Sequence, residues 1–179
     1  MTRVIELSEG RRRLALKRAL RNWPDFLREA LDAETRFGDL PLPALAFLAQ
    51  GKEKASFYLY DFIMNIQDLG SGLSFHELHP KQKVLVIDQY LFFLDRLRFE
   101  CMKRLGWLES YPGEQCTLVD LVLRFHELAP GIQAGIPALH PAHPDYARFR
   151  AVNTFDKEAL VRKLIPRALQ EIALHSSTR

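Results

Sequence analysis

The sequence predicts an all-α domain of six to eight helices packed around a central helix at about residues 81–105. Long stretches carry apolar residues at helical spacing, and no strand-like alternation of any length is present. A chain of 179 residues, 47% hydrophobic and 26% charged, can bury a substantial core within one domain. We therefore expect residues 1–179 to form a single domain, with 1–7 and 175–179 flexible at its ends.

The central helix is expected over the longest apolar-rich run without glycine or proline, Lys83 to Leu105. Pro80 can open this helix, and Gly106 ends it. Most of its helical wheel is apolar, so the helix should be buried on several sides. Its polar residues share one narrow arc of the wheel: Gln89, Arg96, Glu100 and Lys103.

The N-terminal part predicts three helices of moderate length. Ser8 can cap the first, which should run from Glu9 to Arg21. The second can begin at Pro24 and run to Glu34, and the third should extend from Pro43 to Gly51. A strongly helical segment then follows, from Lys52 to Leu69.

This fourth helix is the expected packing partner of the central one, because it is rich in aromatic residues. Asp61 and Asp68 fall in its narrow polar stripe, so we expect water to solvate both. After it, Ser74 and Glu77 have the spacing of a capping box around a short turn.

The C-terminal half predicts a helix from Thr117 to Leu128 that Pro130 and Gly131 stop. Residues 129–144 hold four prolines and two glycines, and an ordered loop of this length often covers or forms a site. One or two helical turns are expected over 145–152. The last helix should run from about Glu158 to Leu174, with a bend at Pro166.

The positive charge is concentrated at the N-terminus. Residues 1–21 hold seven basic and two acidic residues, while the rest of the chain holds 18 basic and 20 acidic ones. A basic helix can contact nucleic acid or an acidic partner, or it can be a solvated helix that pairs with acidic residues of its own chain. Without a DNA-reading motif, nucleic acid is the disfavoured partner. The interaction candidates are these cations and three aromatic residues near connections: Arg11, Arg12, Arg13, Lys17, Arg18, Arg21, Trp23, Trp107 and Tyr111.

Several classes of protein are disfavoured by composition. No apolar stretch is long enough for a membrane-spanning helix, and the N-terminal residues lack the pattern of a secretory signal. Cys101 and Cys116 form no CxxC pair, so neither a disulfide framework nor a thiolate zinc site is indicated. These features predict a cytoplasmic protein.

Two aspartates on the central helix suggest a polar site. Asp88 and Asp95 share their arc with apolar residues, so each should need water, a proton or a partner. An ion pair is one interpretation, either between Asp95 and Arg98 or with a cation from a neighbouring helix. The other is a metal site, because His126 is expected on the apolar face of its own helix and would also need a polar partner.

The metal candidates are therefore His76, His79, Asp88 and His126, converging beneath the 129–144 loop. Glu77 or Glu127 could act as a general base there. A short internal sequence repeat, which we call the sequence echo, consists of LSFHELHP at 73–80 and LRFHELAP at 123–130. Each copy contains a His–Glu pair. Its other interpretation is a pair of helical turns that end at proline.

The sequence contains none of the common catalytic or nucleotide-binding motifs. The first functional hypothesis is therefore a soluble helical module that binds another protein or its own copy. The alternative is a metal-dependent, hydrolase-like enzyme with a divalent metal in the His/carboxylate site.

Overall fold

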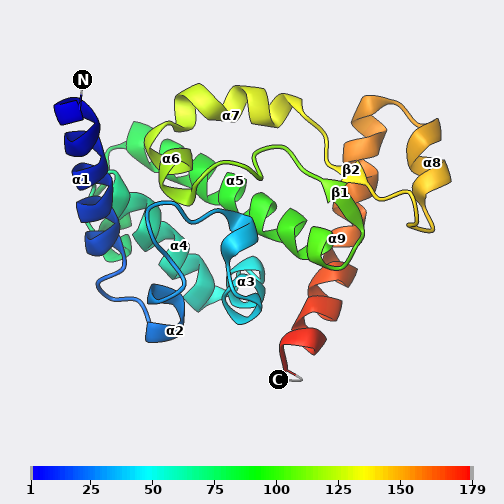
Figure 1. Ribbon diagram of the computed structural model, residues 1–179, viewed down its shortest axis with the longest axis horizontal. Helices are drawn as coiled ribbons and strands as arrows, with labels where there is room; N and C mark the ends of the chain where they lie inside the picture. The colour runs from blue at the N-terminus through cyan, green and yellow to red at the C-terminus, as the bar shows by residue number, and fades with distance from the viewer. Residues whose placement is uncertain (1, 178–179) are drawn as a thin grey trace.

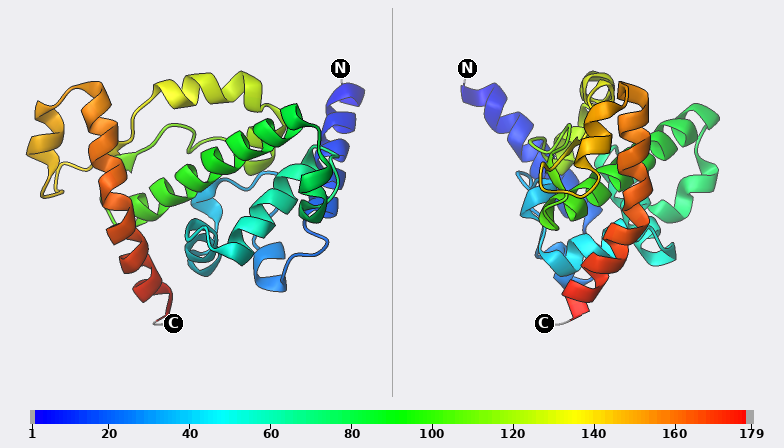
Figure 2. Two further views of the ribbon diagram at one scale, coloured as in Figure 1. Left: turned by 180° about the vertical axis from the view of Figure 1, so that it is seen from behind. Right: turned by 90° about the vertical axis from the view of Figure 1, so that its right-hand side faces the viewer.

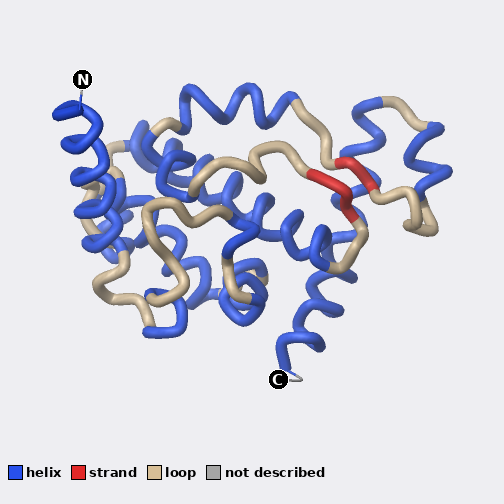
Figure 3. The backbone as a smooth tube through the Cα atoms, in the orientation of Figure 1, coloured by secondary structure: helices blue, strands red, loops and turns tan. Residues whose placement is uncertain are grey.

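The computed structural model describes residues 2–177, and its side chains from Glu9 to Ser176. Helices make up 69% of the chain, which confirms the all-α prediction (Figures 1 and 3). The α-helices are α1 Thr2–Ala19, α2 Asp25–Arg28, α3 Leu42–Ala49, α4 Glu53–Ile66, α5 Pro80–Arg104, α6 Leu118–Leu123, α7 Phe125–Ala134, α8 Tyr146–Ala151 and α9 Thr154–Ser177. Two 3₁₀ helices complete the helical elements: η1 Phe37–Asp39 and η2 Gly72–Glu77.

Helix α5 is the central element, as predicted. It contacts α3, α4 and α9, and α7 runs alongside it (Figures 1 and 2). Helix α1 packs on α4 at one end of the molecule, while α8 lies at the other end. The apolar core is continuous from α1 to α9, and none of the helices in the described range is long and apolar enough to cross a membrane.

Three of the four residues in the polar arc of α5 face inward, the reverse of what an amphipathic pattern indicates. Gln89 is 1% exposed, and Arg96 and Glu100 are each 5% exposed. Apolar side chains on the N-terminal half of the helix face solvent instead, with Val84 59% and Leu91 52% exposed. The buried polar side chains must therefore find partners inside the protein.

One of those partners lies in α6, and the others lie in the irregular segment that follows α5 and β1. The side-chain nitrogen of Gln89 donates to the carbonyl of Val122 at 3.1 Å, and Nη1 of Arg96 donates to the carbonyl of Pro112 at 2.8 Å. Glu100 accepts from the Tyr111 hydroxyl at 2.8 Å. The inward polar arc thus holds the irregular segment after α5 against the helix, where its backbone would otherwise lack hydrogen-bond partners.

A short antiparallel sheet, absent from the prediction, follows the central helix. Strand β1 Leu108–Ser110 pairs with β2 Ala138–Leu139, which lies in the proline-rich segment expected as a long loop. Strands of two and three residues carry too little alternation for the sequence to reveal them. The sheet shortens the loop and ties it to the end of α5.

The first two helices also differ from expectation. Helix α1 begins before Ser8, so Ser8 is not its cap, and the expected helix to Glu34 ends at Arg28. Beyond it, the hydroxyl of Thr35 accepts from the Asp32 backbone N–H and donates to the Asp32 carboxylate. Such local bonds compete with helical ones and explain the early end.

The helix expected from Thr117 divides into two. Thr117 caps α6 through a hydrogen bond from the Asp120 backbone N–H, but the chain leaves helical geometry at Arg124. It then continues as α7, with Pro130 inside the helix and exposed. The prediction that Pro130 stops the helix is wrong, because on an exposed turn water can solvate the carbonyl that a proline leaves unbonded. The division gives nine α-helices in the described range, against the six to eight expected.

Asp61 is buried, which corrects the expectation that it is solvated. It is 1% exposed, and its carboxylate accepts from the backbone N–H of Gly72 at 2.9 Å and from the Asn65 amide at 3.1 Å. Burial raises the pKa of Asp61. This side chain therefore anchors the start of η2 to α4.

Candidate functional site

The three aromatic interaction candidates are mostly internal. Trp23 is 4% exposed and packs against Tyr58 and Phe62, and Tyr111 is 3% exposed and bonded to Glu100. Trp107 is half-buried beneath the guanidinium of Arg167, 5.3 Å from the ring centre. Neither Trp23 nor Tyr111 can anchor an interface in this fold, because a partner cannot reach a buried ring.

Two of the basic candidates are also occupied within the chain. Arg12 donates to the carbonyl of Ala33 and to the hydroxyl of Thr117, both at 3.3 Å, and its Nη2 lies 3.3 Å from the Asp120 carboxylate. Arg18 donates twice to the carbonyl of Asn65. These two arginines tie α1 to distant segments, so their role is structural.

The other cations of this cluster are exposed. Arg13 pairs with Glu9 one turn earlier on α1. The side chains of Arg11, Lys17 and Arg21 make no ion pair or hydrogen bond with any residue the structure describes. Exposed cations without an internal partner are free to attract a negatively charged partner.

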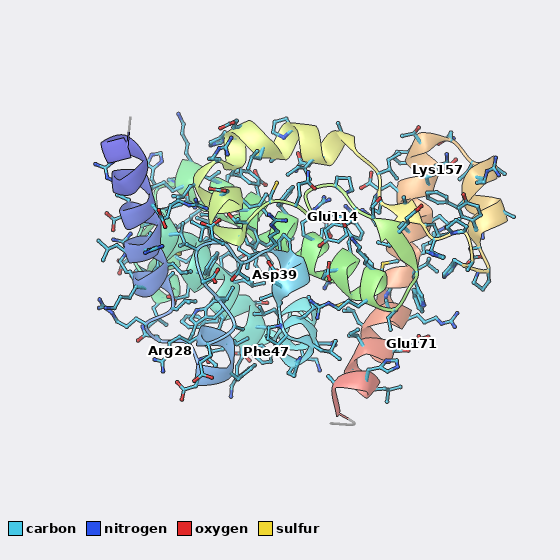
Figure 4. All side chains as sticks on the ribbon, in the orientation of Figure 1. Arg28, Asp39, Phe47, Glu114, Lys157 and Glu171 are labelled. Carbon is cyan, nitrogen blue, oxygen red and sulfur yellow. The ribbon has the colours of Figure 1, made fainter. Side chains whose placement is uncertain are left out.

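A groove of about 1010 Å³ lies between α1 and residues 28–34, and we call it the basic groove. One wall carries Leu14 and Lys17, three residues apart and therefore on one side of α1, and Arg21 in the turn that follows the helix. Leu14 is 66% exposed. Arg28 of α2, labelled in Figure 4, belongs to the opposite wall, as does Leu31. The groove thus combines apolar side chains with cations on both sides.

A second cleft, of about 570 Å³, lies between α5, α7 and α9, and we call it the central cleft. It brings together Asp88 from α5 and His126 from α7, two of the four metal candidates, beside the start of the 129–144 segment. Both side chains are exposed. Asp88 therefore has water access, one of the three alternatives expected for it, whereas the expectation that His126 lies on an apolar face and needs a polar partner is wrong.

The remaining histidine candidates lie outside the cleft. His76 belongs to η2, is exposed, and lies 3.6 Å from the carboxylate of Glu77. His79 caps α5, with Nδ1 accepting from the backbone N–H of Lys81. The two copies of the sequence echo also fold differently, the first as a 3₁₀ helix and the second across the junction of α6 and α7. Glu127 pairs with Arg124 on the surface, which lowers the pKa of Glu127.

No group of three or more His, Cys, Asp or Glu side chains within the described residues is placed to hold a metal ion. Asp88 and His126 share a cleft without forming an ion pair with each other. The predicted metal site therefore remains a prediction, in which water or a bound substrate would have to supply further ligands.

The cleft contains an ion-pair network that the sequence indicated only in general terms. Arg162 of α9 binds Asp95 with both terminal nitrogens, at 2.9 and 2.8 Å, and its Nε bonds Glu158 at 3.0 Å. The hydrogen bond to Asp95 raises the pKa of Arg162. Asp95 is therefore paired with a cation from a neighbouring helix, rather than with Arg98. The partners are 67 positions apart in the chain, which explains why no local pattern reveals the pair.

Arg96 lies deeper in the same cleft. Its guanidinium sits 4.7 Å from the ring centre of Phe92 and 5.1 Å from that of Phe99, and burial lowers its pKa. Its Nε is buried without a hydrogen-bond partner in the part of the chain that the structure describes. Arg96 therefore acts as part of the cleft wall.

Comparison with known proteins gives no relative to guide the assignment: no family model, no curated protein and no solved structure matches this chain. The function must therefore be argued from the two grooves alone.

Proposed function

We propose that the protein is a helical binding module that holds an acidic, leucine-rich helix of another protein in the basic groove. The observation that carries this proposal is the wall formed by Leu14, Lys17 and Arg21, where an exposed leucine lies beside two cations whose side chains have no partner among the described residues. An amphipathic helix binds such a groove by placing apolar side chains on the floor and charged ones on the rim.

The charges along the groove determine which partner is favoured. Its lining holds five cations against three carboxylates: Arg13, Lys17, Arg18, Arg21 and Arg28 against Glu9, Asp32 and Glu34. A net positive rim attracts acidic partners and repels basic ones. The leucines favour a protein over nucleic acid, because a phosphate backbone has no apolar side chains to bury among them.

The binding test uses a fluorescein-labelled peptide that carries leucines on one helical face and glutamates on the other. Fluorescence anisotropy should show saturable binding that weakens as salt rises, because exposed charges are screened. The double variant Lys17→Glu/Arg21→Glu should bind at least about tenfold more weakly, a change of about 1.4 kcal/mol. A peptide with glutamine in place of glutamate should bind more weakly to the wild-type protein.

The matched control reverses two exposed charges at the other end of the molecule, Arg148→Glu/Arg150→Glu on α8 (Figure 1). It changes the net charge by the same amount and should leave peptide binding intact. Equal losses in the two double variants would refute a local site. Tight binding of a single-stranded DNA oligonucleotide, with no binding of the peptide, would replace the protein partner with a nucleic acid. We also propose that the protein acts in the cytoplasm. Size-exclusion chromatography with light scattering would show whether a second copy of the chain takes the place of the other protein.

A metal-dependent hydrolase is the second candidate, and the observation in its favour is that Asp88 and His126 line one cleft. Elemental analysis of the purified protein tests it. Near-stoichiometric divalent metal that is lost in His126→Ala would support this candidate, whereas substoichiometric metal in the wild-type protein would remove it.

A further inference from the structure

The central cleft has the size and lining of a small-molecule site. Its volume of about 570 Å³ lies within the range of roughly 300–1,000 Å³ that is typical of ligand pockets. Three phenylalanines from two helices line it, Phe92 and Phe99 from α5 and Phe125 from α7. The cleft is separate from the basic groove, which involves none of these helices. Its charges determine which ligands it can take.

Both guanidinium groups of the cleft are already occupied. Arg162 is shared between Asp95 and Glu158 through three hydrogen bonds of 2.8 to 3.0 Å. Arg96 is 5% exposed, packs on two phenylalanine rings and donates to the Pro112 carbonyl. An anionic ligand would have to break one of these contacts before it could bind either cation, so the cleft disfavours anions.

The carboxylates of the cleft are not all occupied. Asp88, Asp95 and Glu158 outnumber the two guanidinium groups. The Asp88 side chain forms no hydrogen bond or ion pair with any other residue in the described range. It lines the same cleft as the phenylalanines and lies one turn before Phe92. A carboxylate without a partner beside aromatic side chains can bind a cation that also carries an apolar group.

We infer that the central cleft binds a small organic cation, in which an amine or guanidinium group is joined to an apolar group. The charged group pairs with Asp88, and the apolar group packs against Leu91 and Phe125. This activity goes beyond the proposed peptide binding, uses different residues, and does not depend on a metal.

Isothermal titration of the full chain tests this inference with three probes of similar shape: 2-phenylethylamine, 2-phenylethanol and 3-phenylpropionate. The amine should bind saturably with a Kd at or below about 1 mM, and the alcohol and the acid should bind at least about tenfold more weakly. Asp88→Asn should weaken amine binding by a similar factor. The exposed position of Asp88 means that this variant should keep its fold, which circular dichroism can verify.

The matched control is Asp25→Asn, which removes an exposed carboxylate outside the cleft and should leave amine binding unchanged. The inference is overturned if the amine does not bind, if the three probes bind equally, or if the acid binds best. It is also overturned if Asp88→Asn binds the amine as tightly as the wild-type protein does.

Discussion

The buried hydrogen bond between Tyr111 and Glu100 predicts a measurable coupling between these two residues. The bond is 2.8 Å long, and the two residues are 3% and 5% exposed. Burial and the neighbouring Glu100 carboxylate raise the pKa of Tyr111, so the hydroxyl stays protonated and donates. Nε of Arg104 donates to the other oxygen of Glu100 at 2.9 Å.

Tyr111→Phe should lower the free energy of unfolding by about 1.5–3 kcal/mol, because it leaves one oxygen of a buried carboxylate without its donor. Glu100→Ala should cost about 3 kcal/mol or more, since it leaves a buried hydroxyl unpaired and Arg104 with one partner fewer. The loss of unfolding free energy in the double variant should be smaller than the sum of the two single-variant losses by about 1–2 kcal/mol.

Urea unfolding followed by circular dichroism measures these values, with an unchanged m-value as evidence that the unfolding transition is comparable. Glu127→Gln serves as the control, because its carboxylate is exposed and should contribute little. Fully additive losses in the double-mutant cycle, or a Tyr111→Phe variant as stable as the wild-type protein, would refute the inward role of the polar arc of α5.

Two further predictions concern buried ionisable groups. The His143 side chain is 6% exposed, near Asp145 and Arg167, and burial lowers its pKa below 6.5, so the unfolded chain binds the proton more readily than the folded one. The free energy of unfolding should therefore fall as pH drops from 7 to 5. The fall should be smaller in His143→Asn than in the wild-type protein or in the exposed control His76→Asn. Asp61→Ala should lower the free energy of unfolding by about 1–3 kcal/mol, because the Gly72 N–H loses its acceptor. Asp61→Asn keeps an acceptor oxygen and should cost less at pH 7; equal losses in the two urea-unfolding curves would contradict this role.

The positions of the long helices could be predicted from the sequence, but the orientation of the central one could not. Helical periodicity and the flanking Pro80 and Gly106 define α5 almost to the residue. Periodicity identifies a polar arc without showing what it faces. Arg96 and Glu100 face inward because the segment after α5 needs hydrogen-bond partners, and that need appears only once the chain is folded.

The candidate sites could be predicted only in part, for a similar reason. The basic cluster on α1 is evident from composition, but Arg12 and Arg18 bind carbonyls that are 21 and 47 residues away. The sequence alone therefore could not separate them from the exposed Lys17 and Arg21. Asp88 and His126 do share a cleft, but both side chains are exposed, so water can solvate them without the metal that was expected to pair them.

The basic groove is tested most directly by a titration of ¹⁵N-labelled protein with the leucine–glutamate peptide, followed by amide chemical shifts. The account predicts that the largest shift changes fall on residues 13–21 and 28–34, the two walls of the groove. They should be absent in Lys17→Glu/Arg21→Glu and retained in Arg148→Glu/Arg150→Glu. Shift changes that concentrate on α7 and α9, or that survive the reversal of Lys17 and Arg21, would contradict it.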